Sequence, residues 1–318
     1  MKWILLFLFS SSCANISALS KKEDVKNVSV PDSSNSVSST KVEESWPSTF
    51  DVYNGKLKYI NFPLIRGEET KRNNDKIICK EQGVEKPLIK MIPFVREGNT
   101  AKLYYAESYH SQAKKHFCYL GERQVFTINV KLFPYKEEHL SVARSKVVLS
   151  KKDQARAARE WHMLQKIYKN AYKGSYINEP FIVPLDSYIT SRYGKRRVFN
   201  KVKKTQHLGN DFRAKVGLPI PASNRGAVVF AGDLFYTGNV VILDHGLGVF
   251  SLYAHLSKVI SKVGDIVERG AIVGLSGMTG RVSGPHLHWG VKVHGFNIDG
   301  FSLVDESKNQ FSMNEKLY

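Results

Sequence analysis

Three features are scarce in this 318-residue chain: cysteine, acidic side chains and long apolar runs. Cysteine occurs only three times and never close to the C-terminal histidines, which argues against a cysteine-ligated metal site. Past the N-terminus no segment is typical of a transmembrane helix. The 29 Asp and Glu residues are outnumbered by 47 Lys and Arg, so the net charge is +18 and we expect an anionic partner. Charge alone does not choose among nucleic acid, an acidic membrane surface and a cell-wall polymer.

The first twenty residues have the layout of a secretory signal. Lys2 precedes an apolar run that is too short to span a bilayer, and small residues follow it. We expect cleavage after Ser20, although two upstream alanines also suit. Lipidation of Cys13 is a less favoured alternative, because Ser10 stands where a lipoprotein signal usually carries Leu or a similar residue.

Export narrows the list of partners and compartments. An exported protein seldom meets chromosomal DNA, so we expect no nucleic-acid partner and no stable membrane insertion once the signal is removed. The chain is assigned to the periplasm or cell envelope, with secretion as the alternative. Cys79 and Cys118 would then remain in an oxidising compartment, which predicts one disulfide, with two buried free thiols as the alternative.

The chain is predicted to be mainly β, in segments of different composition. Residues 21–48 are rich in Ser, Val and charge, which is typical of a flexible linker. Residues 49–135 alternate short apolar runs with Gly, Asn and Pro, which predicts a small antiparallel domain like a β-sandwich, regulatory or wall-targeting. Residues 177–304 carry Gly at nearly every turn, which predicts a compact antiparallel sheet or barrel-like domain. Residues 305–318 are predicted to be a loosely held polar tail.

One helix is predicted between the two β regions, over residues 150–174. Ser150 and Asp153 form an N-cap pair, and Gly174 is a suitable stop. Apolar residues recur at spacings of four, three, four and three, which indicates one helical stripe. The stripe consists of Ala157, Trp161, Leu164, Tyr168 and Ala171.

Two short motifs near the C-terminal end could supply metal ligands. In GPHLHWG, His286 and His288 occupy alternate positions of an expected strand and therefore share a face. In QHLGNDF, a fully extended strand would hold the Cα atoms of His207 and Asp211 about 13 Å apart, so the chain must bend between them, and Gly209 makes a bend cheap. Each motif alone is more simply explained as structural.

A third motif, LYAHLS, ends an alternating apolar run at His255, which alone would be a strand-end histidine. Together, the three motifs in this order resemble the LytM/lysostaphin family of zinc metalloendopeptidases, which cut peptide bonds in bacterial peptidoglycan. The resemblance covers about residues 180–304, including TSRYGKR and GDIVERGAIVGLSGMTG. It implies the duplicated hybrid motif fold, peptidoglycan as partner and one Zn²⁺ per catalytic domain.

The resemblance also implies the role of each residue. His207, Asp211 and His288 would ligate zinc, and His255 and His286 would be the catalytic histidines. Two imidazoles and a carboxylate leave the fourth tetrahedral position open, as in catalytic zinc sites. Amide hydrolysis also needs a base for the water and a donor for the oxyanion, and the sequence does not say which histidine serves as which.

Other candidates and other functions stay open. Asp244 and His245 resemble ligands but are interpreted as a turn. A catalytically silent protein of the same fold, binding the wall or activating another hydrolase, is the alternative function, disfavoured because no site residue is missing. An exported adhesin or nucleic-acid binder would leave the histidines unexplained. Crosslinks ending in D-alanyl-diaminopimelate are the first expected substrate and glycine bridges the second. The oligomeric state is left open.

Overall fold

The computed structural model describes residues 49–66, 76–84, 89–140, 149–199 and 203–315. The predicted signal, the linker and Cys13 lie outside these described residues. Residues 48–318 form one compact unit. No helix within the described ranges is long and apolar enough to cross a membrane.

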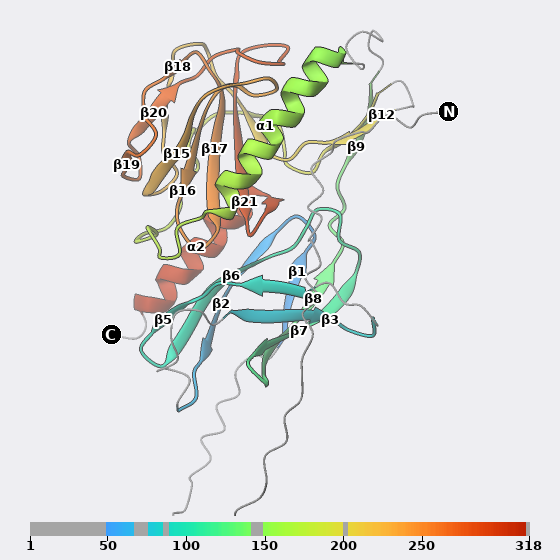
Figure 1. Cartoon of the computed structure of the whole chain (residues 1–318), viewed down its shortest axis with the longest axis vertical. Coiled ribbons are helices and arrows are strands. Elements are labelled where there is room, and N and C mark those ends of the chain that lie inside the picture. Colours follow the sequence, from blue (N-terminus) through green and yellow to red (C-terminus); the bar gives the residue numbers. More distant parts are fainter. Residues whose placement is uncertain (1–48, 67–75, 85–88, 141–148, 200–202, 316–318) are drawn as a thin grey trace, which may run out of the picture. The chain divides into compact units, whose positions relative to one another are not determined.

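The first described region is built from two sheets around a common core (Figure 1). One sheet has the order β1 (Thr49–Tyr53), β8 (Arg123–Lys131), β7 (Lys114–Leu120), β3 (Ile77–Glu81) and β4 (Ile89–Ile92). The other has the order β2 (Leu57–Pro63), β6 (Thr100–Ala106) and β5 (Val95–Glu97). Ile60 and Leu103 from the second sheet pack with Phe126 and Ile128 from the first. This is the sandwich-like region that the alternating pattern predicted.

The prediction that this region is purely antiparallel is wrong at one edge. Strand β1 runs parallel to β8, from Thr49 opposite Thr127 to Tyr53 opposite Lys131. A parallel pair needs a long crossover, and the strands of both sheets lie between β1 and β8 in the chain and provide it. Composition and alternation do not distinguish the two directions.

The predicted disulfide is confirmed. Cys79 and Cys118 are bonded, and they face each other across the antiparallel pair β3 and β7. Both side chains are fully buried in the sandwich core. The bond closes a loop across a sequence separation of 39 residues.

Replacing both cysteines by alanine (Cys79→Ala with Cys118→Ala) should lower the free energy of unfolding by about 2–4 kcal/mol, because the unfolded chain regains the freedom that the loop removes. Denaturant unfolding with and without reductant measures this. The wild type should be destabilised by reductant and the double variant should not; a reductant-insensitive wild type would contradict the prediction.

The predicted helix is present as α1 (Lys151–Lys169). The Ser150 hydroxyl accepts the Asp153 backbone N–H at 3.1 Å, as the N-cap pattern predicted, but the helix ends at Asn170, before Gly174. Only the second half of the stripe enters a buried cluster, where Leu164 and Tyr168 pack against Phe250 and its neighbours. Figure 1 shows α1 lying along the sheet of the following region.

The second region is dominated by an eight-stranded sheet. Its order is β10 (Ile189–Ser191), β13 (Asn210–Arg213), β21 (His286–Val293), β17 (Val249–Leu256), β16 (Gly238–Asp244), β15 (Gly226–Leu234) and β19 (Ile266–Val267), with β22 (Phe296–Ile298) on β21. A small sheet contains β14 (Pro219–Pro221), β20 (Ile272–Leu275) and β18 (Lys258–Val259). A third contains β12 (Lys203–Gln206), β11 (Arg196–Phe199) and β9 (Glu137–Leu140), with β9 parallel to β11.

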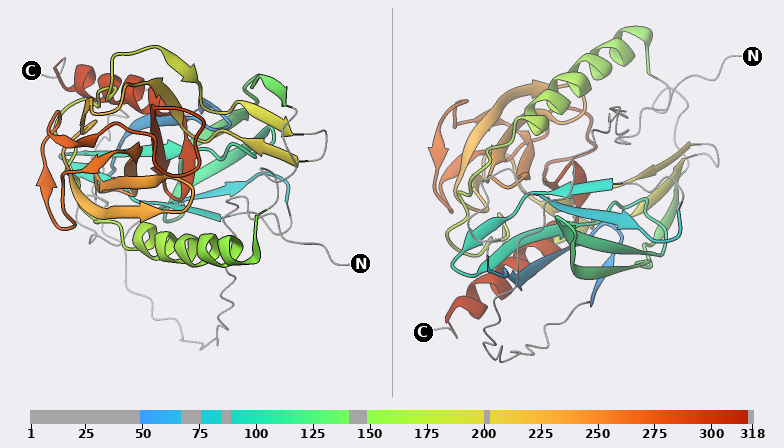
Figure 2. Two further views of the ribbon diagram at one scale, coloured as in Figure 1. Left: turned by 90° about the horizontal axis from the view of Figure 1, so that it is seen from above. Right: turned by 60° about the horizontal axis from the view of Figure 1, so that its bottom comes forward.

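The polar tail predicted over residues 305–318 differs from the structure, which has helix α2 (Gly300–Glu315) there. Leu303, Val304 and Ser307 are buried, and Glu306 accepts the backbone N–H of Tyr59 at 3.0 Å. In the right-hand view of Figure 2, the red helix α2 lies beside the blue strand β2. Leu303, Val304 and Ser307 recur at helical spacing and form a narrow buried face on α2. The rest of the sequence there is polar, so its composition alone does not reveal this face. Because α2 lies along β2, residues of both predicted β domains pack into one hydrophobic core. The domain boundaries expected from the sequence stay predictions.

His245 and Asp244 are structural, in line with their interpretation as a turn. Asp244 accepts the backbone N–H groups of Tyr172 and Gly246 at 2.7 and 2.8 Å. The fully buried His245 donates from Nδ1 to the Arg225 carbonyl at 2.7 Å, which leaves Nε2 to accept the Ser251 hydroxyl at 2.8 Å. Burial lowers the pKa of His245 to about 4, so the ring is neutral at pH 7.

This burial predicts acid sensitivity. The pKa of His245 is about 4 in the folded chain against an ordinary 6.5. The contribution of the neutral, buried ring to the free energy of unfolding is therefore complete above pH 6.5 and is lost as the pH falls towards 4. The loss should reach about 3 kcal/mol for this residue. His245→Asn should be less stable at pH 7 but should lose less stability between pH 7 and 4, as measured by denaturant unfolding.

His162→Asn is the matched control, because that side chain is exposed on α1. Its pH dependence should equal that of the wild type. Equal acid sensitivity of His245→Asn and the wild type would show that the burial of His245 is not a source of the acid sensitivity.

Candidate metal centre and catalytic histidines

Three side chains that the sequence singled out converge on one point. His207 Nε2 lies 3.0 Å from Asp211 Oδ1, His288 Nδ1 lies 2.7 Å from the same oxygen, and the two nitrogens are 3.2 Å apart. They form a group in which each residue offers one ligand atom. All three side chains are largely buried, with side-chain exposures between 8% and 19%, so a ligand there meets little bulk water.

The sheet creates this convergence. Strand β13 pairs with β21 so that Asp211 lies opposite His288, and directly opposite residues project from the same face. His207 follows β12, and the chain bends before β13 begins at Asn210, so the ring returns to Asp211 instead of lying a full strand length away.

Gly209 is required here for a reason that differs from the expected one. Its φ is outside the left-handed region, so the bend does not depend on unusual backbone freedom. A Cβ at this position would lie 2.5 Å from His288 Cε1 and 2.6 Å from its Nε2. Glycine therefore leaves the space that the His288 ring occupies.

Neighbouring groups set the tautomer of His207. Its Nδ1 lies 3.1 Å from the Arg192 carbonyl and 3.2 Å from Ser191 Oγ. A carbonyl can only accept, so Nδ1 carries the proton and the Nε2 lone pair faces Asp211. Arg197 donates to Ser191 Oγ at 3.0 Å from the β11 strand. No sequence pattern marks Ser191 or the Arg192 carbonyl as a partner of His207, because residue identity carries no signal for a backbone acceptor.

The carboxylate of Asp211 is held in its charged form. Burial raises the pKa of this carboxyl, but its close side-chain interactions with His207 and His288 outweigh burial and leave the pKa well below its usual range. A charged oxygen between two imidazole nitrogens is the donor set of a divalent transition-metal site.

The donor set fits a zinc ion. Ligand bonds of about 2.0–2.2 Å in tetrahedral geometry separate donor atoms by roughly 3.3 Å, close to the 2.7–3.2 Å found here. Three protein ligands also leave one position open, which distinguishes catalytic from structural zinc sites.

The two remaining histidines stand beside this cluster. The rings of His255 and His286 are 4.7 Å apart, and the rings of His255 and His288 are 5.9 Å apart. His255 donates from Nδ1 to the Thr279 carbonyl at 2.9 Å, and His286 donates from Nδ1 to the Gly284 carbonyl at 2.9 Å. When it is uncharged, each ring therefore presents an unprotonated Nε2.

A bulge in β17 directs His255 into the site. The register against β16 shifts between Asn239 and Val241, and His255 has φ of +61°, which is rare outside glycine. Burial, and then the positive potential of His288 and His286, lower the pKa of His255 to about 4. The sequence predicted His255 as a site residue but gave no sign of the bulge, because a bulge depends on the partner strand.

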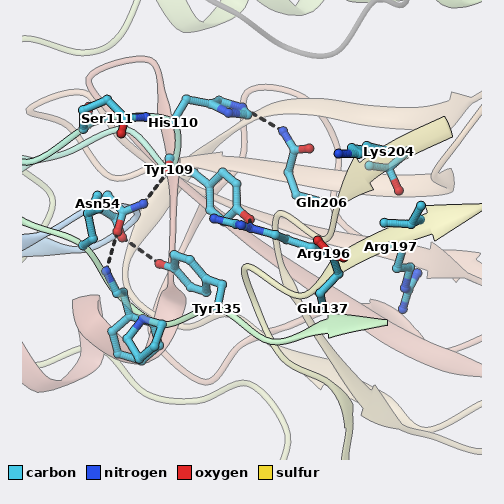
Figure 3. A pocket seen from close by; sticks show the side chains of 16 residues that line it. Asn54, Tyr109, His110, Ser111, Tyr135, Glu137, Arg196, Arg197, Lys204 and Gln206 are labelled. Carbon is cyan, nitrogen blue, oxygen red and sulfur yellow. Dashed lines mark hydrogen bonds between the residues drawn. The ribbon is translucent and has the colours of Figure 1, made fainter. Parts of the chain in front are cut away.

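Figure 3 shows a cavity of about 460 Å³ whose lining includes none of the five candidate site residues. Its lining includes Arg196, Lys204 and Gln206, and Gln206 bonds to His110 at 2.7 Å. Arg196 and Gln206 are opposite partners in the β11–β12 hairpin. Arg197 also lines the cavity, and it donates to Ser191 Oγ beside His207.

A mainly β scaffold with a buried two-histidine, one-aspartate cluster and two adjacent histidines defines a candidate metallohydrolase. Residues 205–300 match peptidase family M23. This matched segment, which contains the candidate metal ligands, is a LytM-type (peptidase M23) domain match.

Three relatives illustrate the match. Peptidoglycan DD-endopeptidase ShyA of Vibrio cholerae is 43% identical over 115 residues, which are 35% of this chain and 27% of ShyA. Lysostaphin of Staphylococcus staphylolyticus is 43% identical over 93 residues, which are 29% of this chain and 19% of lysostaphin. A Pseudomonas aeruginosa crystal structure assigned to peptidase M23 superposes with a TM-score of 0.56 at 24% identity, covering 79% of this chain and 94% of that one. The chain thus spans about a quarter or less of these two curated relatives.

Gly209→Ala should weaken zinc binding by about 10- to 100-fold, because the new methyl group displaces the His288 ring. Competition against a chelator measures the affinity, and circular dichroism reports whether the chain is folded. Gly232→Ala in β15 is the control, since its Cβ would meet nothing closer than 3.5 Å. Unchanged affinity in Gly209→Ala would show that the ring does not need this space.

Proposed function

We propose that this chain is an exported zinc metalloendopeptidase that hydrolyses peptide crosslinks of bacterial peptidoglycan. The observation that carries the proposal is the convergence of His207, Asp211 and His288 within hydrogen-bond distance, beside His255 and His286. The match of residues 205–300 to peptidase family M23 and the similarity to a peptidoglycan DD-endopeptidase support it.

In this proposal His207 Nε2, Asp211 Oδ1 and His288 Nδ1 hold the zinc ion. Bound zinc supplies a Lewis acid that polarises a peptide carbonyl and brings the pKa of water to about 7. The protein keeps the ligand atoms in place: the Arg192 carbonyl fixes the His207 tautomer, and the β13–β21 register fixes Asp211 against His288.

His255 and His286 carry out the proton transfers. Because the Thr279 and Gly284 carbonyls hold their Nδ1 protons, both rings turn Nε2 towards the reaction space. A neutral Nε2 takes a proton from the attacking water, and the same nitrogen, once protonated, donates to the oxyanion or to the leaving amine. Two adjacent rings allow one to act as base while the other donates.

The proposed substrate and compartment follow from the charge and the N-terminus. A net charge of +18 favours an anionic wall polymer, and the predicted secretory signal would deliver the chain to the periplasm or cell envelope. D,D-crosslinks to diaminopimelate are the first candidate bonds and glycine bridges the second. The region before α1 would regulate access to the site or target the wall.

His286→Ala should reduce the rate of crosslink cleavage by about 100- to 10,000-fold while zinc content stays at one per chain, because the variant loses a proton-transfer group and no ligand. His207→Ala should lose both zinc and activity. Mass spectrometry of digested peptidoglycan and metal analysis of the purified variants check the two readouts.

His162→Ala controls for loss of an exposed histidine and should be fully active. Activity retained in His207→Ala would contradict zinc-dependent hydrolysis. A wild type that binds peptidoglycan but releases no product would favour the silent alternative instead.

A further inference from the structure

Arg213 lies on the same face of the sheet as the candidate catalytic residues. It is two positions after Asp211 in β13, and the register places it opposite His286. Between them, Phe212 pairs with Leu287, and both of these side chains are buried in the core. Strand alternation therefore directs Arg213 outward beside His286.

The neighbouring segment holds Arg213 in place. The guanidinium lies 5.1 Å from the centroid of the Tyr188 ring, within cation–π range. The backbone N–H of Arg213 donates to the Tyr188 carbonyl at 2.8 Å, and the Ser187 hydroxyl donates to the Arg213 carbonyl at 2.6 Å. Tyr188 is 69% exposed, so the pair is accessible to a large ligand.

The charge of Arg213 is not neutralised locally. Among the described residues no carboxylate lies within ion-pair distance of it, whereas Arg225 and Arg269 in the same region pair with Glu268 and Glu179. Asp211, the carboxylate on its own face, is already engaged by His207 and His288. A positioned guanidinium without an acidic partner is suited to bind a carboxylate through two parallel hydrogen bonds.

We propose that Arg213, supported by Tyr188, binds a carboxylate of the substrate beside the scissile bond. The site would then select an acidic peptide crosslink, such as one containing diaminopimelate, over a neutral glycine bridge. This inference rests on the proposed function and specifies its substrate class. The peptide would lie along the row formed by Arg213, His286 and His255, with its carbonyl over the metal cluster.

The test uses the full mature chain and two crosslinked muropeptide dimers of the same sequence, one with free carboxylates and one with carboxamides in their place. The wild type should have a KM about 10- to 100-fold lower for the acidic dimer, the range expected of a charge-assisted hydrogen-bonded pair. Arg213→Gln should abolish this preference. Arg213→Lys should retain part of it, because the charge remains but the two-pronged geometry is lost.

Arg96→Gln is the matched control, since Arg96 also lies over an aromatic ring, 4.9 Å from that of Phe94, but in β5. It should keep the wild-type preference, and equal melting temperatures show that all variants are folded. An undiminished preference in Arg213→Gln, or a wild type that cuts both dimers with equal KM, overturns the inference alone. If the wild type cuts neither dimer, the proposed function fails, and calorimetric binding of the two dimers to wild type and Arg213→Gln still decides whether Arg213 selects the carboxylate.

Discussion

The candidate site depends on the register between β13 and β21. This one antiparallel pair places Asp211 opposite His288, Arg213 opposite His286, and Phe212 opposite Leu287 in the core. A shift by one residue would exchange the two faces, burying the ligands and exposing the apolar pair. The burial of Phe212 and Leu287 thus stabilises the register that assembles the chemistry, so the hydrophobic core and the metal cluster support the same arrangement.

The sequence predicted which residues would lie together in the candidate site but not how they are positioned. His207, Asp211, His255, His286 and His288 were found because ligand types recur at recognisable spacings. The bulge that turns His255, the carbonyls that fix the tautomers, and the true reason for Gly209 were not found. Each of these depends on an atom from a distant segment, usually a backbone atom, and a backbone atom leaves no trace in residue identity.

The fold was predictable from the sequence to about the same extent as the candidate site. Alternation gave the two β regions, and helical spacing gave α1, because these signals are local. Three features could not be predicted in this way: the parallel pairing of β1 with β8, the strand β9 beside β11, and helix α2. The two pairings join distant segments of the chain, and the composition of α2 does not reveal a helix. The polar sequence of α2 suggested a tail, but a helix needs only a narrow apolar face where another element covers it.

The contact between α2 and β2 has a consequence for biosynthesis. The Leu57 backbone N–H bonds to Ser302 Oγ, a partner 245 residues further along the chain. At about 5–20 residues per second, a ribosome needs roughly 12–50 s to make the intervening chain. During that interval one flank of the β2–β6–β5 sheet has no helix to cover it, so the newly made chain exposes apolar surface that the finished protein buries.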